Sequence, residues 1–170
     1  MKRRVIVGID PGTGMKSGLG FAAVDADTGR VLALHTLWTS ADPKKTPAWK
    51  RIRELASVLK QGFDLIAPNL EDVFIESFVM QAKSGETLAR LVGAVIGIIP
   101  LSTRFTEVAN TRVKKYVSGK GNSDKLDVAK ALFLVYPYDV ELIQKHIDKE
   151  DWDALDALAI LTAGVKQNGS

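Results

Sequence analysis

Five stretches of this chain have the length and the apolar, β-branched composition of buried β-strands. They cover residues 5–10, 19–24, 31–38, 70–76 and 105–108. The turn Asp27-Thr28-Gly29-Arg30 separates the second stretch from the third, and a short turn that contains glycine favours a hairpin. We therefore expect the first three strands to follow one another in antiparallel order.

Apolar residues at helical spacing predict five helices after the third strand. Their expected bounds are 48–61, 84–99, about 110–117 and about 124–132, and the last helix begins near residue 148 or 151 and runs to about 164. Pro47 suits the first position of the first helix, and Gly62 suits its end. The residues expected to cap the first four helices are Thr46, then Ser84, then Asn110 or Thr111, and then Ser123 or Asp124.

Two of the predicted strands end on a carboxylate. The apolar run Val5-Ile6-Val7-Gly8-Ile9 leads to Asp10 and ends at Pro11-Gly12. In the same way, the apolar run Val73-Phe74-Ile75 leads to Glu76. The carboxyl ends of strands are where open α/β sheets hold ligands, although Asp before Pro-Gly also suits a simple turn. Two carboxylates on adjacent strands would repel each other unless a cation or a proton lies between them.

Two further acids lie on the last predicted helix. Asp153 and Asp156 are three residues apart, so they share one helical face. Asp153 also fits the preference for acids in a first helical turn, whereas Asp156 lies between Leu155 and Ala157, where a lone carboxylate is costly. If these two acids meet Asp10 and Glu76, the four carboxylates favour Mg²⁺ or Mn²⁺. Two such ions about 4 Å apart can support in-line hydrolysis of a phosphodiester.

The composition limits the kinds of catalytic and metal sites that this chain can form, and it bears on membrane contact. The 170 residues suit one domain, residues 1–170, and include no cysteine, which excludes disulfides, cysteine zinc sites and thiol nucleophiles. Metal ligands other than oxygen could come only from His35 and His146. The longest uncharged stretch, which begins at Leu91, is too short to span a bilayer. We expect a cytoplasmic protein without membrane contact.

Basic residues gather in the segment between residues 104 and 130, around a glycine-containing turn. Free backbone amides and lysines in such a turn suit phosphate contacts, although a plain connector between two helices would have the same composition. The candidate residues here for contact with the phosphates of a nucleic acid are Arg112, Lys114, Lys115, Lys120 and Lys125.

Four motifs, in this order along nearly the whole chain, resemble the RuvC-type Holliday-junction resolvases. They are Gly8-Ile9-Asp10-Pro11-Gly12, Ile75-Glu76-Ser77, the basic run from Asn110 to Lys125, and Asp153-Ala154-Leu155-Asp156-Ala157. The resemblance implies an α/β fold of the RNase H-like type, with a five-stranded mixed sheet flanked by helices on both faces. It also implies a homodimer with the 84–99 helix at its interface.

The same resemblance implies a function in DNA recombination and repair. The expected activity is Mg²⁺-dependent nicking of two opposed strands of a four-way DNA junction, with two ions per active site, leaving 5′-phosphate and 3′-hydroxyl ends. Asp10, Glu76, Asp153 and Asp156 would be the metal-binding catalytic residues. Lys114 and Lys125 would face the DNA backbone, and Phe78 would be the aromatic residue that stacks at the junction.

Three other functions compete with this one. Gly8-Ile9-Asp10-Pro11-Gly12-Thr13-Gly14 also resembles the first phosphate loop of the actin, Hsp70 and sugar-kinase superfamily, whose members need two such domains to enclose ATP. An RNase H-like nuclease that processes RNA is a closer alternative. The third is a DNA-binding protein that keeps the fold without metal or catalysis.

Overall fold

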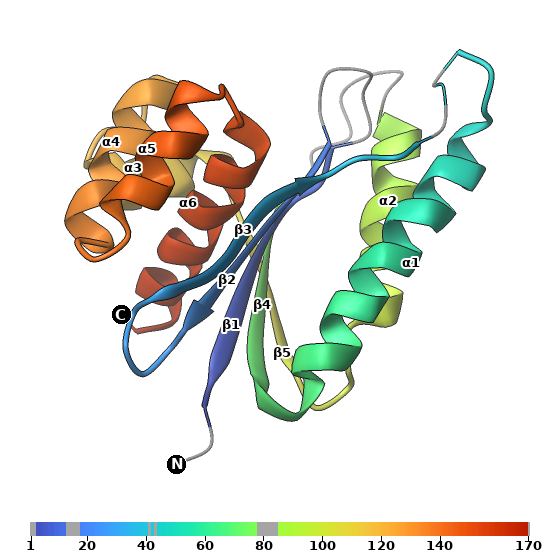
Figure 1. Cartoon of the computed structure of the whole chain (residues 1–170), viewed down its shortest axis with the longest axis horizontal. Helices are drawn as coiled ribbons and strands as arrows, with labels where there is room; N and C mark the ends of the chain where they lie inside the picture. The colour runs from blue at the N-terminus through green and yellow to red at the C-terminus, as the bar shows by residue number, and fades with distance from the viewer. Residues whose placement is uncertain (1–2, 13–17, 41, 43, 78–84, 170) are drawn as a thin grey trace.

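The protein is a five-stranded sheet with helices on both faces (Figure 1). The computed structural model describes residues 3–12, 18–40, 42, 44–77 and 85–169. The helices α1 and α2 cover one face of the sheet, and α3 to α6 lie on the other (Figure 1). Within the described ranges, no helix combines the length and the apolar composition needed to cross a membrane.

The sheet has the mixed topology expected from the sequence. Its strand order is β3-β2-β1-β4-β5. The pairs β3–β2 and β2–β1 are antiparallel, and the pairs β1–β4 and β4–β5 are parallel. The carboxyl ends of β1 and β4 therefore lie at the same edge. The strands are β1 (Val5–Asp10), β2 (Leu19–Asp25), β3 (Val31–Leu37), β4 (Leu70–Glu76) and β5 (Arg104–Val108).

Within the part of the chain that the structure describes, six α-helices follow the first three strands, one more than the sequence pattern predicts. The additional helix is α5, and a short 3-10 turn at Ala67–Asn69 also lies outside the prediction. The helices are α1 (Ala48–Ile66), α2 (Gly85–Ile98), α3 (Asn110–Ser118), α4 (Lys125–Val135), α5 (Val140–Asp148) and α6 (Trp152–Asn168).

Three expected helix boundaries are wrong. The helix α1 continues through Gly62 to Ile66, because the fully buried Phe63 ties this last turn to the core and outweighs the weak helix propensity of glycine. Pro47, not Thr46, occupies the N-cap position of α1, with no side-chain hydrogen bond. At α3, Ala109 is the N-cap, so the helix begins one residue earlier than a cap at Asn110 would require.

The expected start of α4 is confirmed. Asp124 is its N-cap, and the Oδ1 atom of Asp124 accepts a hydrogen bond of 2.8 Å from the backbone N–H of Asp127. This contact satisfies one of the amides that the first turn of a helix leaves without a partner. The expected cap at Ser84 lies outside the described residues.

The side chains of β1 pack into two hydrophobic cores, one on each face of the sheet. Val7 and Ile9 face the core under α1 and α2, and Ile6 faces the core on the side of α6. A central strand that is buried on both faces must be apolar along its length, which explains the continuous run that precedes Asp10.

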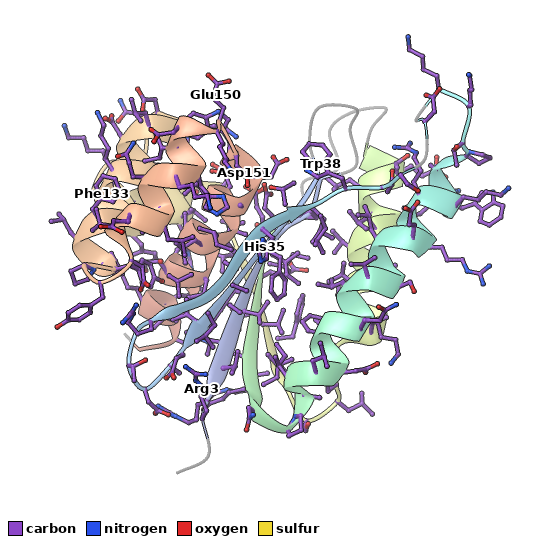
Figure 2. All side chains as sticks on the ribbon, in the orientation of Figure 1. Arg3, His35, Trp38, Phe133, Glu150 and Asp151 are labelled. Carbon is purple, nitrogen blue, oxygen red and sulfur yellow. The ribbon has the colours of Figure 1, made fainter. Side chains whose placement is uncertain are left out.

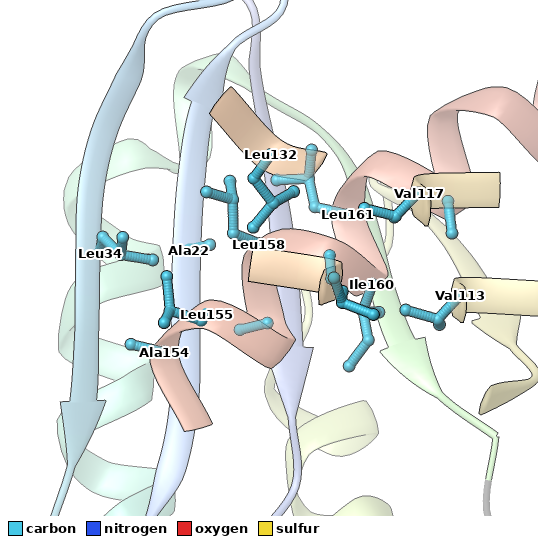
Figure 3. Packing of buried hydrophobic residues seen from close by; sticks show 14 of the residues in the cluster. Ala22, Leu34, Val113, Val117, Leu132, Ala154, Leu155, Leu158, Ile160 and Leu161 are labelled. Carbon is cyan, nitrogen blue, oxygen red and sulfur yellow. The ribbon is translucent and has the colours of Figure 1, made fainter. Parts of the chain in front are cut away.

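The helix α6 lies between the sheet and the smaller helices, and Figure 3 shows the packing of Leu158 and Leu161 in this core. Residues Ala154–Gly164 of α6 are buried except for Asp156. A helix covered on all sides is expected to be apolar around its circumference.

Two sheet glycines allow this helix to approach closely. A Cβ atom at Gly8 would lie 2.1 Å from the carbonyl oxygen of Ala157, and one at Gly20 would lie 1.9 Å from that of Asp153. The backbone of α6 thus occupies the space that side chains would take at these two positions. This contact fixes the height of α6 above β1 and β2.

We predict that Gly8→Ala lowers the free energy of unfolding by at least about 1–3 kcal/mol, the usual penalty for overpacking a core. The clash is with backbone atoms of α6, which cannot turn away. Gly62→Ala is the matched control, because no atom lies within 4 Å of the added methyl. Inside α1 it should raise stability by about 0.5–1 kcal/mol. Urea denaturation of both variants tests this pair, and equal midpoints would contradict it.

Candidate active site

The acids predicted at two strand ends lie next to each other. Asp10 is the last residue of β1 and Glu76 is the last residue of β4. The preceding residues, Ile9 and Ile75, are register partners in the parallel pair. The two carboxylates therefore leave the sheet at the same edge from adjacent strands.

The N-terminal end of α6 adds the other two acids, Asp153 in its first turn and Asp156 one turn later. The close approach at Gly20, the register partner of Asp10, places the backbone of Asp153 against β2 beside the end of β1. The backbone N–H of Gly18 donates a hydrogen bond of 2.7 Å to Oδ2 of Asp153. The expected convergence of strand ends and helix is thus a result of glycine contacts that sequence spacing does not reveal.

Asp10 lies close enough to the other three acids for their charges to affect its protonation. Burial, followed by the negative charges of Asp156, Glu76 and Asp153, raises the pKa of Asp10 to about 8. Burial likewise raises the pKa of Asp153, although the N–H of Gly18 and the charge of Lys125 oppose this. Without a cation, Asp10 therefore retains a proton at neutral pH.

Asn110, which the sequence offers as a cap for the third helix, is instead a hydrogen-bond partner of Glu76. Its side-chain amide donates a hydrogen bond to Oε1 of Glu76 from the first position of α3. Burial raises the pKa of Glu76, and this hydrogen bond opposes the rise because it favours the charged carboxylate. Asn110 thus acts on the acid site and does not cap α3.

Lys125 forms an ion pair with Asp156, the acid that lies between apolar residues in the sequence. Its Nζ atom lies 2.7 Å from Oδ2 of Asp156, and the side chain of Asp156 is 32% exposed. Burial tends to lower the pKa of Lys125, but the hydrogen bond to Asp156 and the nearby charges of Asp10 and Asp153 outweigh it, so the pKa lies above its ordinary value. A lone carboxylate between Leu155 and Ala157 is costly, and the positive charge of Lys125 compensates for the charge of Asp156.

A pocket of about 150 Å³ opens among these groups. Three of the four acids line it, together with Lys114 and Lys125. Asp153 is absent from its lining, although its charge acts on Asp10. The lining residues are Asp10, Glu76, Asn110, Val113, Lys114, Lys125, Val128, Asp156 and Ile160.

The donor set fits a divalent cation in chemistry and in location. Carboxylate oxygens are the ligands that Mg²⁺ and Mn²⁺ prefer, and the mutual repulsion that raises the pKa of Asp10 is what a cation would relieve. Among the described residues, however, no group of three or more acidic or histidine side chains is arranged to hold a metal ion. Glu76, Asp153 and Asp156 each accept a hydrogen bond from a protein donor in this structure.

The remaining predicted DNA-binding residues lie outside the pocket. Arg112 and Lys115 are exposed on α3, and Lys120 is exposed in the turn between α3 and α4. Phe78, the expected stacking residue, lies outside the described residues. The structure therefore brings Lys114 and Lys125 to the acids and leaves the other basic residues on the surrounding surface.

A second polar cluster joins β3 to the start of α6. The Thr36 hydroxyl donates a hydrogen bond to Oδ1 of Asp151, whose Oδ2 lies 2.8 Å from Nδ1 of His146. Figure 2 shows Asp151 near the same end of the sheet as Trp38. The sequence does not reveal this cluster, because Thr36 and Asp151 are 115 residues apart along the chain.

Comparison with known proteins identifies the family. The family model "Crossover junction endodeoxyribonuclease RuvC" matches residues 6–163. This chain belongs to the RuvC family. The crossover junction endodeoxyribonuclease RuvC of Campylobacter jejuni serotype O:2 is 30% identical to it over 163 residues, which cover 91% of this chain and 90% of the relative. The RuvC of Campylobacter concisus is 32% identical over 132 residues, which cover 73% of this chain and 76% of the relative.

Solved structures of the RuvC family share the fold. The structure of T. thermophilus RuvC in complex with Holliday junction substrate superposes with a TM-score of 0.66 at 22% identity, over 94% of this chain and 92% of the other. A second structure of Thermus thermophilus RuvC gives a TM-score of 0.63 over the same shares of the two chains. These matches confirm the RNase H-like architecture predicted from the resemblance.

We predict that Asp10→Asn stabilises the metal-free protein increasingly as pH rises. The pKa of Asp10 lies at about 8 in the fold and at 3.8 in its ordinary state. Folding therefore favours the protonated form, so this group's contribution is complete below about pH 4 and is lost as pH rises to about 8. Near pH 8, the free energy of unfolding of the variant should therefore exceed that of the wild type by roughly a few kcal/mol.

Urea denaturation in EDTA across this pH interval tests the prediction. Asp64→Asn is the control, because Asp64 is exposed on α1 beside Lys60, and its pH dependence should follow the wild type. Parallel curves for Asp10→Asn and the wild type would contradict the assignment.

We predict that Asn110→Ala raises the pKa of Glu76 further, because the variant lacks the amide that stabilises the carboxylate. NMR titration of the Glu76 carboxyl carbon without metal measures this directly. Thr111→Ala, which removes the exposed neighbouring side chain on α3, should leave the titration unchanged. A Glu76 titration that is the same in Asn110→Ala and in the wild type would show that the hydrogen bond has no effect.

Proposed function

We propose that this chain, as a single domain over residues 1–170, is a Mg²⁺-dependent endonuclease that resolves four-way DNA junctions in recombination and repair. It would nick two opposed strands symmetrically and leave 5′-phosphate and 3′-hydroxyl ends. The observation that carries the proposal is the pocket lined by Asp10, Glu76 and Asp156 beside two lysines, in a chain whose family model spans residues 6–163.

Each acid would contribute carboxylate oxygens to the divalent ions. Asp10 and Glu76 lie on a rigid sheet edge and Asp156 on a buried helix, so the fold holds the side chains at well-defined positions. Bound ions, two per site, would activate a water and stabilise the oxygen that leaves the phosphate. Mn²⁺ should substitute, because it accepts the same oxygen ligands.

The lysines would hold the DNA strand at the acids. Lys114 lines the pocket from α3 and Lys125 from the start of α4, where both can meet backbone phosphates. A phosphate would also take over Lys125 from Asp156, and thereby free that carboxylate for metal binding. Arg112, Lys115 and Lys120 would extend the contact along the DNA.

We further propose a homodimer that uses the outer face of α2. Ile96 is 41% exposed there, and Gly93 and Gly97, one helical turn apart, have open space around them. Such a surface allows a second helix to approach closely. A two-fold dimer would present two acid sites to a substrate that itself has two-fold symmetry.

The proposed activity predicts that the wild-type protein nicks a synthetic four-way DNA junction in Mg²⁺ and not in EDTA. Asp10→Asn should lower the nicking rate by more than about 100-fold. Loss of a residue that only supports a metal ligand costs up to about 100-fold, so loss of a ligand itself should cost more. Binding of the junction in EDTA should persist, because the lysines remain. Asp64→Asn should behave as the wild type.

Gel analysis of end-labelled strands measures both the rate and the two cut positions. Symmetric cuts would support the dimer together with the chemistry. If Asp10→Asn nicks at nearly the wild-type rate, the metal assignment is wrong. If a structured RNA is cut and the DNA junction is not, the RNA-processing alternative replaces the proposal.

A further inference from the structure

An exposed tryptophan stands at the edge of the sheet that carries the acids. Trp38 follows β3 directly, and Leu37 at the end of β3 is the register partner of Leu19. The next residue of β2, Gly20, pairs with Asp10, so the end of β3 and the acid end of β1 lie at the same edge. Figure 2 shows Trp38 at this end of the sheet.

The indole of Trp38 is not needed to fill a core. The residue is 56% exposed, whereas tryptophan usually buries most of its large surface. An exposed tryptophan beside a site is typical of residues that bind a partner through the face of the ring.

The indole also lies close to backbone that contacts the acid site. A Cβ atom at Gly18 would lie 3.2 Å from Cδ2 of Trp38, and the N–H of Gly18 holds the Asp153 carboxylate. The hydrogen bond from Thr36 to Asp151 joins the same end of β3 to the residue before α6. A change in the position of β3 would therefore be felt at Asp153.

The strand order places Trp38 opposite the basic side of the site. From Asp10 on β1, one direction leads to β4 with Glu76, and the other leads through β2 to β3. Lys114 and Lys125 enter the pocket from α3 and α4 beside Glu76. A nucleic-acid strand that crosses the acids thus meets cationic groups on one side and an aromatic face on the other.

We propose that Trp38 is a DNA-contacting residue whose indole stacks on a nucleotide of the strand held in the acid pocket. This inference rests on the proposed nuclease function. Lysines bind the backbone without regard to the bases, whereas stacking on an aromatic side chain holds an unpaired or displaced base in place. Trp38 would therefore fix how far the strand extends past the acids on the β3 side.

The chain offers a matched control of the same residue type. Trp49 is 53% exposed, but it lies on α1, which covers the opposite face of the sheet from α6, and its ring contacts Lys50. The comparison of Trp38→Ala with Trp49→Ala therefore separates a contact at the acid site from a general loss of exposed aromatic surface.

The experiment measures binding of a fluorescently labelled four-way DNA junction in EDTA, followed by nicking in Mg²⁺. Trp38→Ala should weaken binding by about 5- to 150-fold, the range expected for one stacked base. Trp38→Phe should keep most of the affinity, because it keeps an aromatic face, and Trp49→Ala should match the wild type. Quenching of tryptophan emission by the junction should persist in Trp49→Phe and decrease in Trp38→Phe.

Several results would overturn the inference. One is a Trp38→Ala protein that binds and nicks like the wild type, which would leave the nuclease function intact. Another is a Trp38→Ala protein with a different mass by analytical ultracentrifugation, which would assign Trp38 to contact between copies of the chain. Equal losses in Trp38→Ala and Trp49→Ala would also reject a specific contact. A wild-type protein that neither binds nor nicks the junction would overturn the proposed function, and this inference with it.

Discussion

The close packing of α6 on the sheet is the contact on which the rest of the structure depends. The distance between a helix and a sheet is normally set by the side chains between them, but Gly8 and Gly20 have none, so the α6 backbone meets β1 and β2 directly. The N-terminal turn of α6 then lies beside the strand ends. A larger separation would move Asp153 and Asp156 away from Asp10.

This arrangement concentrates negative charge, and the protein offsets it in a different way at Asp10, Glu76 and Asp156. Asp10 retains a proton, as its pKa of about 8 indicates. Glu76 accepts an amide hydrogen bond from Asn110, and Asp156 is paired with Lys125. All three arrangements are reversible, because a proton can leave and a side chain can turn. The acids can therefore exchange their present partners for others.

The surroundings of the acids are asymmetric. The basic helices α3 and α4 approach from the side of β4 and β5, whereas the aromatic end of β3 lies beyond β2. The Thr36, Asp151 and His146 cluster holds this second side in register with α6. The two flanks therefore offer different chemistry to a strand that passes between them, charge on one side and an apolar ring on the other.

The sequence by itself determined where the five strands lie and how the first three follow one another. It also determined which four acids come together at one end of the sheet. These follow from local rules, because a strand buried on both faces must be apolar and an acid at its end stands out. Tertiary structure alone decided the rest. Packing of Phe63 extended α1 past Gly62, and the contact with Glu76 gave Asn110 its role. Such outcomes depend on residues that are distant in sequence and near in space, which a linear pattern cannot encode.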